Sequence, residues 1–437
     1  MKNSRATRAA LVFGALALVG TACGSDDDTA DDNTDDTTAT TAASSGGSTD
    51  RGNVDGVLKI GTLVPQTGDL NTIVEALQTP IDLALAEIND AGGVFGKDVT
   101  LIPGDDGTSA TVAQSTYDKL INSDKVDFIV GPAPSGVAAK LADSFGADKV
   151  PACSGSTTAA NLEGAGNGYF FRTAPGDDLQ GPALAELITG DNHAKVAILA
   201  RNDDYGKGFS ESLAAALEDG GAEVSATVLY NPDSGSGFDA DVQQALEGNP
   251  DAIAVLGFND DGAQVINSLI GQGKGPDVLP TYTADGMQGS SFGETVDPEN
   301  PGKVAGIKGT APAAAPAGID HPFTAKYAET GVDTIFSAYY YDCTILLALA
   351  AEAAGTDEGS AIKDAFAANL EGDNDCKTFA ECKALLAEGK TIHYRGASSA
   401  YDDWNVMQPA SGVYDVWQYD AEGAVGEVEG ASQIAVP

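Results

Sequence analysis

The stretch that decides the fold starts at residue 57 and reads VLKIGTLV to residue 64, followed by IDLALAEI over residues 81–88 and AGG over residues 91–93. The first run is continuous and apolar, which is typical of a strand in a parallel sheet covered on both faces. In the second run Ile81, Leu85 and Ile88 recur at helical spacing, and the glycines after it are typical of a helix C-cap. This succession predicts an α/β fold.

The same succession continues along the chain and then starts again. Three further apolar runs are predicted strands of a first unit: Val99–Ile102, Phe128–Val130 and Tyr169–Phe171. After about residue 175, five more runs follow at intervals of about 25–30 residues, the length of a strand plus a crossover helix. They are Val196–Leu199, Val224–Leu229, Ile253–Leu256, Val278–Tyr282 and Val304–Ile307. Two such units predict two doubly wound parallel-sheet lobes, with a ligand cleft at the carboxyl ends of the strands.

The first residues have the pattern of an export signal. Lys2, Arg5 and Arg8 precede an apolar run of about eleven residues, too short for a membrane span of roughly 20 residues. We therefore expect residues 1–22 to be a signal peptide. Cys23 has two interpretations: the lipidated first residue of a lipoprotein, which the ending Thr-Ala-Cys-Gly favours, or a free thiol beside an ordinary small-x-small cleavage site.

A low-complexity segment follows the signal. Residues 26–50 read DDDTADDNTDDTTATTAASSGGSTD, with no cation and no apolar residue larger than alanine. Such a segment cannot bury enough surface to fold. We expect residues 23–55 to be a disordered acidic tether, lipidated at its first residue, that holds an extracytoplasmic domain near the cell membrane.

The charge of the chain excludes one class of function. There are 23 Lys and Arg residues against 65 Asp and Glu residues, a net charge of −42. Nucleic-acid binding requires clustered cations that release counterions, so we expect no nucleic-acid partner. Contact with an anionic membrane surface is disfavoured for the same reason, which leaves the lipid anchor as the expected membrane attachment. The three histidines are isolated in the sequence, and we expect neither a metal site nor a cofactor.

The other four cysteines suggest pairing, because an exported protein folds in an oxidising compartment. Cys376 and Cys382 lie six residues apart in a polar segment, and we predict a local disulfide between them. Cys153 and Cys343 have apolar neighbours, which favours small core residues over a bridge. Their pairing stays open at this point.

One motif raises the possibility of an enzyme. Gly289-Ser290-Ser291-Phe292-Gly293 matches the Gly-x-Ser-x-Gly pattern of serine hydrolases. A nucleophile elbow needs a strand directly before the serine and a helix directly after it, whereas this motif lies in a glycine-rich loop. We therefore expect no catalytic residues, and a secreted hydrolase using Ser291 is the weaker hypothesis.

Four long motifs carry a resemblance to a known family. They are LKIGTLVPQTGDL from residue 58, AEINDAGGVFGKDVTLIPGDDGTSA from residue 86, FIVGPAPSGVA from residue 128 and FFRTAPGDDLQGPALAEL from residue 170. In order and spacing they are similar to branched-chain amino-acid-type (Leu/Ile/Val-binding-like) solute-binding proteins of bacterial ABC importers, which have the type I periplasmic-binding fold. The similarity extends from about residue 57 to about residue 420.

The resemblance implies a two-lobed domain of the Venus-flytrap type with three crossover strands, near Thr173–Asp177, near Lys308 and near Thr391–Gly396. Lobe 1 is then expected over residues 56–175 plus 308–392, and lobe 2 over residues 176–307 plus 393–437. The implied function is capture of a small molecule, an amino acid or close analogue, and its delivery to ABC permease subunits by a monomeric receptor. A sensory receptor of the same fold, for amides, urea or other small solutes, is the alternative.

The resemblance also implies six ligand-binding residues. Ser135, Ser156 and Thr158 match residues that hold a ligand carboxylate, the last two also reaching the amino group; Tyr205 matches an aromatic residue from the opposite lobe. Phe258 stands where some relatives have tyrosine, so a hydroxyl contact is lost there. Asp285 matches the carboxylate that pairs with a ligand ammonium. Serine and threonine are also common helix caps, the two aromatic residues could belong to a loop or core, and an aspartate before glycine is common in turns.

Overall fold

The computed structural model describes residues 54–234, 237–405, 407–428 and 433–437. The signal peptide, Cys23 and nearly all of the tether therefore lie outside the described residues. Residues 50–437 form one compact unit. None of the helices in the described part of the chain combines the length and the apolar character needed to cross a membrane.

The first half of the chain forms a five-stranded parallel sheet. Its strands, in spatial order, are β2 (Thr100–Ile102), β1 (Lys59–Thr62), β3 (Phe128–Val130), β4 (Ala152–Ser154) and β5 (Phe170–Arg172). Three of the predicted apolar runs contain or overlap β1, β2 and β3, and a fourth overlaps β5. β4 was not among the predicted strands, because its three small residues carry no strand signal of their own.

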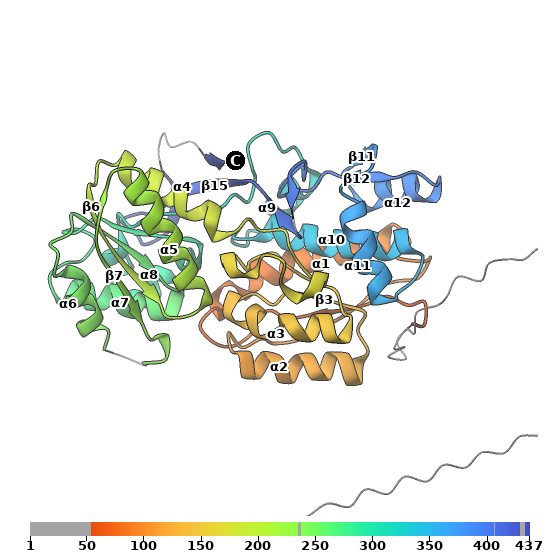
Figure 1. Ribbon diagram of the computed structural model, residues 1–437, viewed down its shortest axis with the longest axis horizontal. Coiled ribbons are helices and arrows are strands. Elements are labelled where there is room, and N and C mark those ends of the chain that lie inside the picture. Colours follow the sequence, from red (N-terminus) through yellow and green to blue (C-terminus); the bar gives the residue numbers. More distant parts are fainter. Residues whose placement is uncertain (1–53, 235–236, 406, 429–432) are drawn as a thin grey trace, which may run out of the picture. The chain divides into compact units, whose positions relative to one another are not determined.

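Helices cover this sheet on both faces. From the first half of the chain they are α1 (Val74–Asp90), α2 (Ala110–Lys119) and α3 (Ser135–Asp148); later segments add α10 (Ser337–Ala354), α11 (Gly359–Ala368) and α12 (Phe379–Ala387). The predicted helix around Ile81 is α1, which ends where Gly92 and Gly93 adopt positive φ. Figure 1 shows α1 beside α10, although more than 200 residues separate them in the sequence.

The second sheet contains the later strands. In order they are β16 (Val425–Glu427), β15 (Gly412–Tyr419), β10 (Lys308–Pro312), β9 (Thr281–Thr283), β8 (Ala252–Leu256), β6 (Lys195–Arg201) and β7 (Glu223–Tyr230), with β17 (Ile434–Val436) also paired to β15. β6 to β10 are parallel, and β15 runs antiparallel to β10. Its helices are α4 (Asp177–Gly190), α5 (Asp204–Asp219), α6 (Asp239–Leu246), α7 (Asn259–Gly271) and α8 (Phe292–Val296).

The end of this unit differs from the expectation. The predicted strand over Val304–Ile307 does not form, because a 3-10 turn over Pro301–Val304 and the positive φ of Gly306 interrupt extended backbone there. The strand begins one residue later, at Lys308, and pairs with β9 and β15. Residues 308–312 thus belong to the second sheet, whereas the sequence division placed them at the start of the return to lobe 1.

The segment that connects α12 to β15 along the chain is held by a buried carboxylate. Asp342 in α10 is fully buried and accepts hydrogen bonds from the Tyr394 hydroxyl (2.8 Å), the Ala397 and Ser398 N–H groups (2.9 and 2.8 Å) and the Tyr401 hydroxyl (2.9 Å). Two short two-stranded sheets flank this segment, β11 (Asn374–Cys376) with β12 (Ile392–Tyr394), and β13 (Trp404–Asn405) with β14 (Gln408–Pro409). The chain is thereby anchored where it passes from α12 to β15. The remaining helix, α9 (Pro322–Ala328), lies between β10 and α10 in the chain.

Two disulfides lie within the described residues. Cys376 and Cys382 are paired, as their spacing predicted. Cys153 and Cys343 are also paired, with their Cα atoms 5.6 Å apart, so the interpretation of these two as unpaired core residues is wrong. Their apolar surroundings are real, since both are fully buried, but β4 and α10 are packed together and bring the two thiols into reach.

Candidate ligand-binding site

The structure brings all six residues that the family resemblance implied to the carboxyl ends of parallel strands. In the first sheet Ser135 opens α3 after β3, and Ser156 and Thr158 follow β4. In the second sheet Tyr205 follows β6 at the start of α5, Phe258 lies between β8 and α7, and Asp285 follows β9. Strand ends of two sheets therefore face one site, which is where open α/β sheets bind ligands.

These six residues line a single cavity between the two walls. Its other lining residues are mostly apolar and were missed by the sequence analysis: Leu70, Ile73, Ala133, Pro134, Gly286 and Phe336. Leu70 and Ile73 follow β1, so a search of the residues after every predicted strand would have found them. Phe336, with positive φ, immediately precedes α10 and had no signal in the sequence.

The wall from the first sheet is a set of hydrogen-bonding groups. The Ser135 hydroxyl oxygen accepts from the N–H groups of Thr158 and Ala159, both at 3.2 Å. Because those bonds use its lone pairs, the Ser135 O–H can donate into the cavity. The Ser156 hydroxyl bonds the Ala133 carbonyl (3.0 Å) and lies 2.9 Å from the Tyr340 hydroxyl. The first turn of α3 adds the positive end of a helix dipole, which suits an anion.

The wall from the second sheet combines aromatic rings with a carboxylate. Tyr205 and Phe258 are stacked with ring centroids 5.3 Å apart. The Tyr205 hydroxyl donates to Asp285 Oδ1 at 3.1 Å, and Gln180 Nε2 donates to the same oxygen at 3.0 Å. Gln180 was not predicted. It lies on the same buried face of α4 as Leu184 and Ile188, where a polar residue is unexpected and is a usable signal.

Asp285 is only 5% exposed. Burial raises its pKa to about 6, although the hydrogen bonds from Tyr205 and Gln180 act in the opposite direction. Asp177, at the start of α4, is fully buried; burial and the charge of Asp285 raise its pKa well above the usual range, against the effects of Thr158 and Arg172. In the described part of the chain no ion pair reaches Asp285, so a positive group on a ligand would compensate it.

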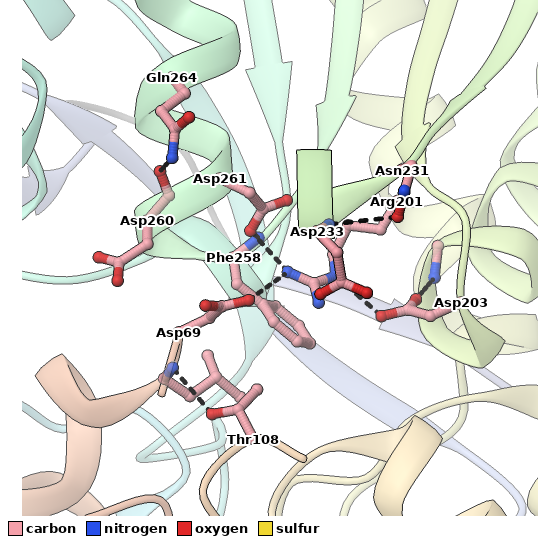
Figure 2. Close-up of polar contacts among 12 residues, drawn as sticks. Asp69, Thr108, Arg201, Asp203, Asn231, Asp233, Phe258, Asp260, Asp261 and Gln264 are labelled. Atoms are coloured by element: carbon pink, nitrogen blue, oxygen red, sulfur yellow. Dashed lines mark hydrogen bonds and ion pairs between the residues drawn. The ribbon is translucent and has the colours of Figure 1, made fainter. Parts of the chain in front are cut away.

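A charged network lies directly behind Phe258 (Figure 2). The Arg201 guanidinium sits 3.8 Å from the centre of the Phe258 ring. Its Nε donates to Asp203 at 2.8 Å and its Nη1 to Asp261 at 2.6 Å. Asp261 in turn accepts from the Phe258 N–H at 3.0 Å. The aromatic wall of the cavity is therefore fixed from behind by an ion-pair network that the sequence analysis did not predict.

The serine hydrolase motif does not form a nucleophile elbow. Ser291 precedes α8, and the element before it is a 3-10 turn over Asp285–Met287 instead of a strand. The three histidines have partners elsewhere: His193 lies 3.8 Å from an Asp251 oxygen, and His321 and His393 bond backbone groups. Across the described residues, no group of three or more His, Cys, Asp or Glu is arranged to hold a metal ion.

Two α/β lobes whose strand ends meet at one cavity form the kind of architecture in which small ligands bind. Comparison with known proteins gives the family. The family model described as periplasmic binding protein matches residues 57–391. The chain belongs to this family, in its branched-chain amino-acid type with the type I fold. Proteins of the family act outside the cytoplasm.

Two curated relatives differ in how much of the chain they match. The substrate-binding protein BasB of a chemotactic signal transduction system in Halobacterium salinarum is 28% identical over 370 residues, 81% of this chain and 85% of that protein. The Leu/Ile/Val-binding protein BraC3 of Rhizobium johnstonii is 30% identical over 165 residues, 38% of this chain and 45% of that protein.

Solved structures with the same fold are known with different ligands. The branched-chain amino acid transporter substrate-binding protein LivJ of Streptococcus pneumoniae, in complex with isoleucine, is 24% identical with a TM-score of 0.68 and covers 87% of this chain and 99% of its own. A solute-binding protein of an ABC transporter from Rhodopseudomonas palustris, in complex with 4-hydroxybenzoate, is 16% identical with a TM-score of 0.68, covering 86% and 97%. At these identities the likeness shows the fold.

Proposed function

We propose that this protein captures an amino acid, or a close analogue, between its two lobes and delivers it to the permease of an ABC importer. Ser135, Ser156 and Thr158 hold the ligand carboxylate, and Asp285 pairs with its ammonium. Tyr205 and Phe258 enclose the ligand from the second lobe. The protein has no catalytic residues and needs no cofactor.

The observation that carries this proposal is the buried carboxylate of Asp285 in a cavity whose other wall holds the Ser135 hydroxyl, free to donate because its lone pairs are occupied. A ligand with a carboxylate at one end and an ammonium at the other satisfies both walls at once. Isoleucine and 4-hydroxybenzoate, the ligands of the two solved relatives, share a carboxylate, and only isoleucine also carries an ammonium. A buried carboxylate without a positive partner is costly, so Asp285 favours the amino acid.

Binding works by differential stabilisation of the closed form. Ligand contacts from both walls exist together only when the lobes are closed, and a ligand shifts a conformational equilibrium by its difference in affinity for the two states. The closed form then docks on the permease. The division into lobe 1 over residues 56–175 plus 308–392 and lobe 2 over 176–307 plus 393–437 belongs to this proposal. The sheet pairing reassigns 308–312 to lobe 2, and the hydrogen bonds to Asp342 of α10 hold residues 394–401 on lobe 1.

The N-terminal segment fits delivery at a membrane. We infer that residues 1–22 are removed, that Cys23 carries the lipid and that the acidic segment up to residue 55 is the tether. The folded part works as a monomer next to the permease. Mass spectrometry of the mature N-terminus distinguishes a diacylglyceryl cysteine from an ordinary cleavage product.

A sensory receptor of the same fold is the second candidate, because the BasB likeness extends over most of both chains. A chemotaxis transducer gene beside this one, in place of permease genes, favours sensing. Loss of amino-acid uptake in a deletion strain favours transport, and unchanged uptake with a lost chemotactic response favours sensing.

Thermal unfolding of the purified ligand-free protein against the twenty amino acids, amides, sugars, polyamines and benzoates tests the ligand class. A ligand at 100 times its dissociation constant stabilises by about 2.7 kcal/mol, or about 3 °C for a chain of this size. A shift with amino acids supports the proposal. A shift confined to benzoates, sugars or neutral amides contradicts the ammonium site. If no compound in the panel raises the unfolding temperature, the whole assignment of ligand is contradicted.

A further inference from the structure

Arg201 ends β6 and is 5% exposed, yet it lies at the rim of the cleft. Beyond its own-lobe partners Asp203 and Asp261, its Nη1 lies 3.5 Å from an oxygen of Asp69. Asp69 follows β1 and belongs to the opposite lobe, where its side chain is 41% exposed. Arg201 thus touches both sides of the cleft, as Figure 2 shows.

The segment that carries Asp69 also forms part of the cavity. Leu70 and Ile73 line the cavity, and Thr72 between them accepts a hydrogen bond from Asn259 Nδ2 of the other lobe at 2.6 Å. Contacts between residues 69–73 and the second lobe, Asp69 with Arg201 and Thr72 with Asn259, therefore join the two lobes beside the cavity.

The surroundings of Arg201 are acidic. Asp203, Asp260 and Asp261 all lie on the second lobe near the point that Asp69 approaches (Figure 2). Burial raises the pKa of Asp260, and the charge of Asp69 raises it further. Burial also raises the pKa of Asp261 against the Arg201 charge and two hydrogen bonds, and the charge of Asp69 adds a smaller rise. One guanidinium faces three carboxylates, one of them from the first lobe, so without it closure would press like charges together.

We propose that Arg201 is the positioning residue that permits the lobes to close, by placing a positive charge between Asp69 of one lobe and the carboxylates of the other. The inference rests on the proposed function for its ligand readout. Arg201 also holds Phe258 in the cavity wall through its stacked guanidinium, so closure and ligand contact share one residue.

The open cleft next to Arg201 makes the electrostatic interactions between Arg201 and the surrounding carboxylates sensitive to salt. This cleft is lined by Arg201, Asp203 and Asp233 from the second lobe, with Thr108 and Ser109 from the first. Groups that border such an open cleft are screened by added ions, and screening weakens repulsion between the carboxylates. Salt should therefore restore part of what loss of Arg201 removes.

The decisive experiment compares Arg201→Gln with the double variant Arg201→Gln/Asp69→Asn. L-Isoleucine is the probe, and stopped-flow fluorescence gives its association and dissociation rates. Repulsion across the cleft should weaken binding by Arg201→Gln about tenfold, mainly by faster dissociation. Adding Asp69→Asn, or 0.5 M NaCl, should recover most of that loss, because the repelled carboxylate is removed or screened. A folded Arg201→Gln protein that Asp69→Asn does not rescue contradicts the proposal, since a role inside the second lobe alone would not respond to Asp69.

A second variant keeps the test decisive if Arg201→Gln fails to fold. Asp260→Asn leaves Arg201 and its partners intact and removes one second-lobe carboxylate whose pKa is raised by burial and by the charge of Asp69, so L-isoleucine should dissociate about twofold more slowly. An unchanged or faster dissociation contradicts the proposal. Asp124→Asn is the matched control, because its exposed ion pair with Lys119 lies away from the cleft, and it should behave as the wild type.

Failure of the proposed function is distinguishable from failure of this inference. If the wild type does not bind L-isoleucine, the ligand assignment is wrong, and small-angle scattering of the ligand-free proteins decides about Arg201. Arg201→Gln should then have a larger radius of gyration than the wild type, and Asp69→Asn should reverse the increase. Equal radii in all three proteins contradict the inference.

Discussion

Asp285→Asn should change two quantities in opposite directions. It should raise the stability of the ligand-free protein and lower the affinity for an amino-acid ligand. Burial raises the pKa of Asp285 from 3.8 to about 6. A shift of about 2 units corresponds to about 3 kcal/mol, by which the ionised side chain opposes folding at neutral pH. Because the folded state has the higher pKa, this cost is absent below about pH 4 and grows as the pH rises toward 6.

Asparagine has nearly the same size and carries no charge. The ligand-free variant should therefore be more stable than the wild type at pH 7, by up to about 3 kcal/mol, and should lack the decrease in stability between about pH 4 and pH 6. The same change removes the counter-charge of a ligand ammonium in a buried site. That loss should cost about 3 kcal/mol or more, which lowers the affinity at least about a hundredfold.

The assay has two parts. Thermal unfolding from pH 4 to pH 8 without ligand gives the stability, and calorimetric titration with L-isoleucine at pH 7 gives the affinity. Asp118→Asn is the control, since Asp118 is exposed and bonds only Gln114 on its own helix among the described contacts. If Asp285→Asn binds L-isoleucine as tightly as the wild type, the ammonium site is wrongly assigned. If it is less stable at pH 7, the account of its burial is wrong.

Three further predictions concern the same site and the disulfides. Ser135→Ala removes the donor aimed at a ligand carboxylate, and calorimetry should show L-isoleucine affinity about tenfold lower; an unchanged affinity would mean that the carboxylate lies elsewhere. Tyr205→Phe removes a hydrogen bond that lowers the pKa of Asp285, so L-isoleucine affinity should fall more at pH 6 than at pH 8, and a uniform loss would speak against a proton effect. Cys343→Ala opens a covalent loop of 190 residues, and Cys382→Ala opens one of 6. Denaturant unfolding should show that the free energy of unfolding falls by about 5 and about 2 kcal/mol, respectively. Equal losses would contradict the chain-entropy explanation.

The local sequence determined most of the strands and helices, because an apolar run followed by an amphipathic helix needs no distant information. It failed where that information is weak. β4 has three small residues whose strand conformation depends on pairing with β3 and β5. Val304 and Ile307 are apolar and buried, yet a turn takes up that stretch.

The candidate site shows the same division. Similarity of motifs predicted six residues, and each follows a strand, so the parallel order of the sheets brings them together in one cavity. Gln180, Leu70 and Phe336 were not predicted. Their positions relative to the cavity depend on how α4, β1 and α10 pack, which no short motif encodes.

By itself the sequence therefore determined the α/β class, the two units, the acidic surface and the short disulfide, all of which depend on residues close in the chain or on composition. The tertiary structure alone decided that Cys153 meets Cys343, that Asp285 is buried, and that Arg201 faces Asp69 across the cleft. The physical reason is the same in each case. Pairing, desolvation and charge contact depend on distances between residues that the chain separates by tens to hundreds of positions.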